Sequence, residues 1–127
     1  MKNLLKLVEQ FQVGSEQTVN KNPIITEKFQ EMYLRFELMK EENSEYIVAV
    51  QNKDLTEVLD ACIDMAYILF GTINMHGLQD VFEEGFKIVH ENNMTKIGPD
   101  GKVIRDASGK ILKPVGYKKV DLTNLIK

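Results

Sequence analysis

The sequence predicts an all-α protein: a four-helix-type bundle that ends in a small C-terminal β-hairpin and an extended tail. Apolar residues at helical spacing over most of residues 3–92, and turn signals that divide them into four segments, predict the bundle. Short alternating segments after residue 97 predict the hairpin. The hydrophobic fraction of 43% in 127 residues excludes wholesale disorder. We expect one domain over 1–127, with a helical body over about 1–96 and a basic hairpin and tail over about 97–127.

The first two expected helices flank a polar loop. Residues 3–13 have apolar side chains at helical spacing and stop near Gly14, whereas residues 14–24 are polar and include a proline. A second helix should begin at Thr26, a residue type that caps helix N-termini, and end at about Gln51. Its apolar stripe consists of Phe29, Met32, Tyr33, Phe36, Met39, Ile47 and Val50.

The third and fourth expected helices each have a start signal. Asp54 is followed three residues later by a glutamate, which is capping-box spacing, so a helix should run from Asp54 to Gly77. Asp80 repeats the pattern, and the fourth helix should end at about Asn92.

The segment after the fourth helix has a different pattern. Residues 102–105 and 110–113 alternate between apolar and polar side chains and flank the turn-forming residues 106–109. This spacing predicts a β-hairpin with a four-residue loop.

Cysteine content and charge limit the class of protein. Cys62 has no second cysteine to pair with, and residues 1–13 lack the continuous apolar region of a signal peptide, so we expect a cytoplasmic protein. Residues 1–86 carry a net charge of −8 and residues 87–127 a net charge of +5. The asymmetry indicates a cation on the first part and an anion near the second, although chance alone can produce it in so short a segment.

Two carboxylates interrupt the most apolar stretch. Eleven of the fourteen residues from Val58 to Gly71 are apolar, and Asp60 and Asp64 are exceptions. We expect the stretch to be too short and too acidic to span a bilayer. On a helix Glu57, Asp60 and Asp64 lie within about 60° of one another. An unpaired buried carboxylate is costly, so a positive group should lie there, either a lysine or arginine or a metal ion.

The second helix has acids that should meet this face. Glu42 and Glu45 lie opposite its apolar stripe, and a short connection makes the second and third helices antiparallel neighbours. Each feature alone has a simpler interpretation: acids on a helix are usually solvated, and Glu57 fits a capping box. Together, carboxylates without histidine or cysteine partners favour a hard cation such as Mg²⁺, Mn²⁺ or Ca²⁺.

These residues also carry a family resemblance. Glu41-Glu42-x-x-Glu45 followed by Glu57-x-x-Asp60 resembles the signature of the MazG-like all-α nucleoside triphosphate pyrophosphohydrolases, which include phosphoribosyl-ATP pyrophosphohydrolase. Similarity to the phosphoribosyl-ATP pyrophosphohydrolase-like branch covers roughly residues 30–122. The similar segments are 58–67, 70–72, 90–96, 100–102 and 109–114. Asn92 departs from this pattern because the branch has serine there.

The resemblance implies a site. It implies Mg²⁺, which Mn²⁺ can replace, held by Glu42, Glu45, Glu57 and Asp60, with Asp64 as a further ligand or an acid beside the ligands. We expect Glu45 also to accept a proton from the attacking water. Asn93 and Lys96 resemble residues near the substrate. Charge suggests Arg105, Lys110 and Lys113 as phosphate contacts.

The implied reaction is hydrolysis of a nucleoside triphosphate between the α- and β-phosphates, which gives a monophosphate and pyrophosphate. Alternatives are phosphoribosyl-ATP hydrolysis in histidine biosynthesis and a non-catalytic helical oligomer that binds nucleotide and metal. We expect a homodimer or homotetramer, because the second helix has two partly apolar faces and the family assembles this way. We expect no nucleic-acid partner, because the basic tail has little aromatic content, and no zinc site at His76 and His90, which lack a cysteine partner.

Overall fold

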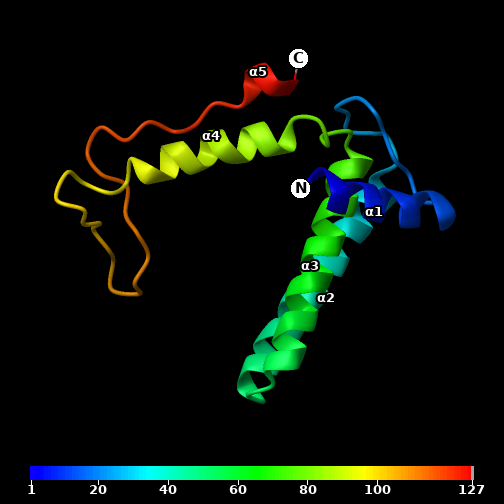
Figure 1. Cartoon of the computed structure of the whole chain (residues 1–127), viewed down its shortest axis with the longest axis horizontal. Helices are drawn as coiled ribbons and strands as arrows, with labels where there is room; N and C mark the ends of the chain where they lie inside the picture. Colours follow the sequence, from blue (N-terminus) through cyan, green and yellow to red (C-terminus); the bar gives the residue numbers. More distant parts are fainter. Residues whose placement is uncertain (127) are drawn as a thin grey trace. The chain divides into compact units, whose positions relative to one another are not determined.

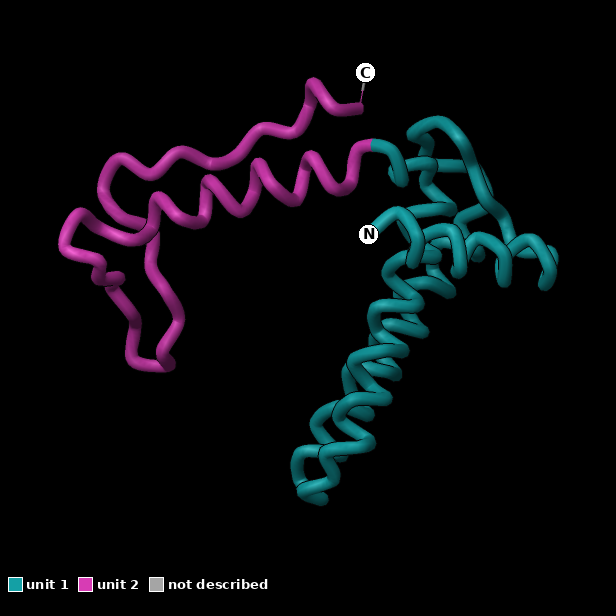
Figure 2. Tube along the Cα trace, viewed as in Figure 1, with its two compact units in different colours: residues 1–80 teal, residues 81–127 magenta. Residues whose placement is uncertain are grey.

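The computed structural model describes residues 1–126 and confirms a mainly helical chain. It divides into two compact units, residues 1–80 and residues 81–127 (Figure 2). The described residues form five α-helices, three in the first unit and two in the second. Each unit is described by itself, and the single domain and four-helix bundle stay predictions.

The first unit is a long helical hairpin with a third helix packed against it. Helices α2 (Phe29–Gln51) and α3 (Leu55–Met75) run antiparallel side by side, and α1 (Lys2–Gly14) packs on α3 (Figure 1). The antiparallel pairing was predicted from the short connection between α2 and α3. It places the acids of both helices along one seam.

The hairpin begins and ends as local chemistry requires, with one correction. Asp54 caps α3 as predicted, because its side chain accepts a hydrogen bond from the Glu57 backbone N–H at 3.1 Å. The predicted cap at Thr26 is wrong: α2 starts at Phe29, and the Thr26 hydroxyl accepts from the backbone of Lys28 at 3.3 Å. Thr26 thus closes a turn before the helix.

The end of α3 requires a glycine. Gly77 has φ +68°, and an added Cβ would lie 2.0 Å from the Asn22 carbonyl oxygen. The left-handed conformation terminates the helix, and the absent side chain admits the loop between α1 and α2.

The core of the first unit is small and partly polar. Its buried apolar side chains are Leu5, Val8, Ala49, Ala61, Ile73 and Met75. Asn74 is fully buried and donates to the Leu5 carbonyl and to the Gln12 side chain, both at 3.0 Å. Gln12 in turn donates to the Gly71 carbonyl at 2.9 Å. These bonds pair the buried side-chain nitrogens of Asn74 and Gln12, while the Asn74 Oδ1 atom is buried without a partner among the described residues. They fix α1 on the C-terminal half of α3.

Arg35 joins α2 to α3 beside this network. Its guanidinium donates to the Ile68 carbonyl at 2.8 Å and to the Thr72 hydroxyl at 3.1 Å. Burial lowers the pKa of Arg35. Gly71 makes room for it, because a Cβ there would lie 2.3 Å from Arg35 Nη2.

Many large apolar side chains of the hairpin are exposed. Phe29, Phe36 and Ile47, on the α2 stripe opposite the acids, have exposed fractions of 63%, 57% and 49%. On α3, Leu59 and Ile63 are also more than half exposed. The prediction that this stretch cannot span a bilayer is not supported, because α3, alone among the described helices, is long and apolar enough to cross a membrane. Core helices of soluble proteins pass the same test of length and composition.

The second unit consists of α4 (Phe82–Met94), a long irregular segment and the short α5 (Thr123–Ile126). The predicted fourth helix exists but starts two residues later than expected and ends beyond Asn92.

The predicted β-hairpin is wrong. In the described part of this unit the chain reverses, but only a single antiparallel bridge forms, between Arg105 and Ile111. The Asp106 carboxylate accepts hydrogen bonds from the backbone N–H groups of Ser108 and Lys110, which stabilises the turn itself. Two short strands that have neither a third strand nor an apolar face to pack gain too little free energy to form further β-bridges.

Candidate metal centre

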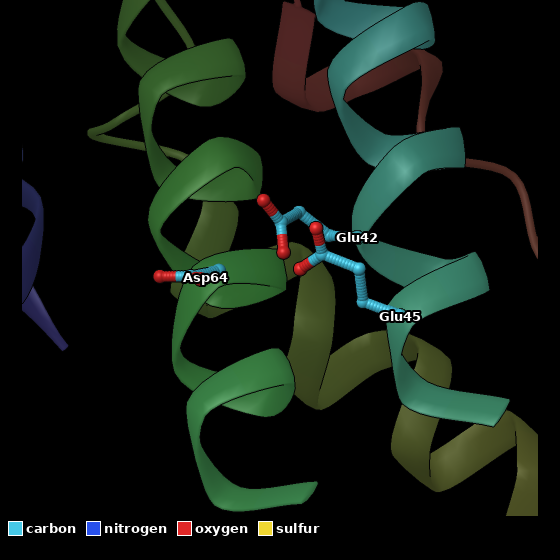
Figure 3. Close-up of side chains that lie close together, drawn as sticks. All are labelled: Glu42, Glu45 and Asp64. Carbon is cyan, nitrogen blue, oxygen red and sulfur yellow. The ribbon is translucent and has the colours of Figure 1, made fainter. Parts of the chain in front are cut away.

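Three acids from α2 and α3 converge at the middle of the hairpin. One carboxylate oxygen each from Glu42, Glu45 and Asp64 lies within 4.8 Å of the other two. Figure 3 shows Glu42 and Glu45 extending from α2 beside the turn of α3 that carries Asp64. Oxygen ligands of this kind suit Mg²⁺ or Mn²⁺.

Glu42 is the least satisfied of the three acids. Its Oε2 atom is buried and has no hydrogen-bond partner among the described residues. Burial, followed by the adjoining Glu45 carboxyl, raises the pKa of Glu42 to about 7. The negative charges of Asp64 and Glu41 act in the same direction. A divalent cation would reverse these effects, because it supplies the missing partner and neutralises the repulsion. The residues present therefore fit a hard cation.

The register of the hairpin explains why Asp64 joins the cluster. Glu42 lies eleven residues before Lys53 at the hairpin tip, and Asp64 lies eleven residues after it, so the two are level across the seam. Asp60 is one helical turn nearer the tip and is exposed, whereas Asp64 is half-buried. The sequence contains this signal, because equal spacing from a short turn is visible without coordinates.

Glu57 and Asp60 line a groove beside the cluster. The groove has a volume of about 820 Å³ and also contains Glu41 and Glu45. Glu45 thus belongs to both the cluster and the groove. Whether Glu57 and Asp60 bind metal, as the resemblance implies, stays a prediction, and so does the role of each residue in the cluster.

The groove has a polar side and an apolar side. The apolar part of its lining consists of Leu34, Leu38 and Val48. Its size is that of a small-molecule site, and its acidic lining repels a polyphosphate unless a cation is present. Sequence reasoning missed Glu37, which also lines the groove and lies four residues before Glu41 on α2.

The predicted substrate residues belong to the second unit. Asn93, Arg105, Lys110 and Lys113 are exposed, and Lys96 is half-buried. The Arg105 guanidinium donates to the Gly109 carbonyl at 2.8 Å, so it closes its own loop and has fewer donors left for a phosphate. Their role as substrate contacts stays a prediction.

Comparison with known proteins identifies the family of the chain. The family model for phosphoribosyl-ATP pyrophosphohydrolase matches residues 8–93. An uncharacterized protein of Acanthamoeba polyphaga mimivirus is 39% identical over 61 residues, which are 48% of this chain and 24% of that relative. The similarity thus spans about a quarter of the relative's length. Because the family match covers more than half of the chain and includes both acidic helices, the chain belongs to the phosphoribosyl-ATP pyrophosphohydrolase family, part of the MazG-like all-α NTP pyrophosphohydrolase superfamily.

Proposed function

We propose that this chain is a Mg²⁺-dependent nucleotide pyrophosphohydrolase that hydrolyses a nucleoside triphosphate to a monophosphate and pyrophosphate. The observation that carries the proposal is the convergence of Glu42, Glu45 and Asp64 around an unpartnered buried carboxylate oxygen. Membership in a pyrophosphohydrolase family supports the same chemistry.

We assign the acids different roles according to how exposed each side chain is. Glu42 and Asp64 are half-buried and would hold the cation, which supplies positive charge to the phosphate oxygens when bound. Glu45 is exposed and borders the groove, so it can accept a proton from the attacking water. Glu57 and Asp60 would hold a second cation or orient waters at the groove's edge.

We propose that lysines after residue 95 contact the polyphosphate. Lys96, Lys110 and Lys113 are our proposed phosphate contacts, because lysine is a suitable point charge for phosphate. Asn93 would donate its side-chain amide to a phosphate or sugar oxygen.

A second candidate is hydrolysis of phosphoribosyl-ATP. The matching family is named after this substrate. The same acidic site could bind the polyphosphate of phosphoribosyl-ATP or of a nucleoside triphosphate. The groove has no feature that selects between the two nucleotides, so a substrate panel decides.

We also propose that the chain functions as a homodimer or homotetramer. The α2 stripe of Phe29, Phe36 and Ile47 and the exposed face of α3 are apolar surfaces of the kind that a second copy covers. A two-helix hairpin packs better when another helical pair closes it into a bundle.

The test is turnover by purified protein with Mg²⁺ and a panel of NTPs, dNTPs and phosphoribosyl-ATP. We expect pyrophosphate release from at least one nucleotide. Glu42→Gln and Asp64→Asn should each lower kcat at least about 100-fold, because each removes a charged ligand. Asp60→Asn should cost less, because Asp60 lies outside the cluster.

Glu27→Gln is the matched control, because Glu27 is exposed, lies outside the site and undergoes the same charge change. No pyrophosphate from any nucleotide, or full turnover by both cluster variants, contradicts the proposal. Binding of nucleotide without product release would favour the non-catalytic oligomer instead.

A further inference from the structure

The second unit contains a cluster of two lysines around one tyrosine. The Lys96 ammonium lies 5.6 Å from the centre of the Tyr117 ring, and the Lys113 ammonium lies 5.7 Å from it. The Tyr117 hydroxyl accepts a hydrogen bond from the Asn92 side-chain amide at 2.6 Å. A half-buried tyrosine thus holds groups from α4, from the turn after it and from the segment near residue 113.

Local backbone structure brings these groups together. Asn92 and Lys96 are four residues apart at the end of α4, where the Lys96 N–H donates to the Asn93 carbonyl at 3.0 Å and continues the helical direction. Across the cluster, Tyr117 N–H donates to the Pro114 carbonyl at 3.1 Å, and Gly116 has φ +83°. This is a turn of type II, which needs glycine at its third position and folds Lys113 back beside Tyr117.

Neither ammonium group has an acidic partner among the described residues. Among residues 1–126 a side-chain ion pair joins Lys21 and Glu9, and none involves Lys96 or Lys113. Residues 96–119 contain seven lysines and arginines but two aspartates. Both aspartates accept backbone hydrogen bonds of their own turns, Asp100 from Lys102 and Asp106 from Ser108. No acidic side chain among the described residues therefore forms an ion pair with either lysine.

We propose that Tyr117 is a positioning residue that holds Lys96 and Lys113 together as a binding subsite for the polyphosphate chain of the nucleotide. The proposal rests on the proposed function for the identity of its ligand. An aromatic ring attracts both cations without neutralising them, unlike a carboxylate. Because each ammonium group lies 5.7 Å or less from the centre of the same ring, a single polyphosphate chain can reach both. Asn92 fixes the ring through its hydroxyl.

Inorganic tripolyphosphate is the probe, titrated into the full chain by calorimetry in EDTA, so that neither metal nor hydrolysis takes part. We expect Lys96→Gln and Lys113→Gln each to weaken binding at least about threefold, the range for an exposed charge contact. Tyr117→Leu should weaken binding by a similar factor although it removes no charge. Tyr117→Phe keeps the ring but loses the hydrogen bond from Asn92, so it should bind more tightly than Tyr117→Leu does.

Lys118→Gln is the matched control, because it removes one charge beside Tyr117 and Lys118 makes no contact with the ring among the described interactions. Circular dichroism checks that the helices persist, and the two lysine variants test the subsite should Tyr117→Leu unfold. If Lys118→Gln and Lys96→Gln weaken tripolyphosphate binding equally, the loss reflects net charge alone and the proposal is overturned. Wild-type affinity in Tyr117→Leu overturns it too.

The subsite and the proposed function fail separately. If no nucleotide is hydrolysed but the binding pattern holds, the subsite stands and the hydrolase proposal falls. If nucleotides are hydrolysed and the Tyr117 and lysine variants bind normally, the subsite falls alone.

Discussion

At the scale of single residues, Glu42 determines how the metal centre responds to its surroundings. Its Oε2 atom is buried without a partner, and burial and neighbouring acids raise its pKa to about 7. Protons and a divalent cation therefore compete for the same carboxylate.

The raised pKa predicts that stability without metal falls with rising pH. The folded chain keeps a proton on Glu42 that the unfolded chain releases near 4.5, so the Glu42 contribution is full below pH 4.5 and lost by about pH 7. Thermal midpoints in EDTA should fall between pH 5 and pH 8 more in the wild type than in Glu42→Gln. Mg²⁺ should raise the midpoint more at pH 8 than at pH 5. Identical pH slopes for the two proteins would contradict this assignment.

Single residues also show where sequence reasoning stopped. Glu42, Glu45 and Asp64 are all in the predicted ligand set, since they are acids on faces that a helical wheel brings together. The wheel shows direction but not depth along the axis, so it did not separate Asp64 from Asp60. The Tyr117 cluster depends on a turn and a long-range contact that no local pattern predicts.

At the scale of elements, the α2–α3 hairpin depends on the close approach of Arg35 to Gly71. The guanidinium occupies the space that a side chain at 71 would need, and it bonds the Ile68 carbonyl and the Thr72 hydroxyl.

Gly71→Ala should therefore lower the free energy of unfolding by about 1 kcal/mol, since lost hydrogen bonds outweigh the gain in helix propensity. In an Arg35→Ala background the same change should stabilise the chain by up to about 1 kcal/mol, because the propensity gain is then opposed only by the milder contact of the added Cβ with Gln12 Nε2 at 3.3 Å. Urea unfolding of the four proteins measures the cycle. The same sign in both backgrounds would show that Arg35 is not the obstacle.

Element boundaries were predictable where the signal was local. The start of α3 follows from Asp54, whose side chain caps the helix. Thr26 can also cap a helix with its side-chain oxygen, but it lies in a loop that tertiary contacts hold in place. One of these contacts is the hydrogen bond from the Ile24 N–H to the His76 carbonyl. The prediction of a β-hairpin after residue 97 was wrong for a related reason. The turn forms, but too few side chains pack against the flanking segments to extend the pairing beyond one bridge.

At the scale of the whole molecule, the amount of apolar surface left exposed is the main feature. The buried apolar side chains of the first unit are few, whereas aromatic residues of α2 remain exposed. Sequence reasoning predicted that α3 is buried because it is apolar on most sides. In the chain alone Leu59 and Ile63 are exposed, so that burial requires the proposed partner copy.

Sedimentation at micromolar concentration should show a dimer or tetramer. Phe36→Glu should shift the protein toward monomer and lower its thermal midpoint, because it places a charge in the apolar stripe. Gln30→Glu is the control: it adds the same charge to α2, but at a position about 100° around the helix from Phe29 of the apolar stripe. It should change neither the sedimentation state nor the thermal midpoint. A wild-type monomer at this concentration, or equal effects of both variants, would contradict the assembly.

Under the proposed assembly, the small core of the first unit would make turnover depend on the concentration of the protein. A chain that completes its packing through another copy has a folding equilibrium that depends on the total amount of protein. Product formed per molecule would then decline in dilute samples even with nucleotide and Mg²⁺ in excess. Cells that make little of this protein would have less activity than its copy number implies.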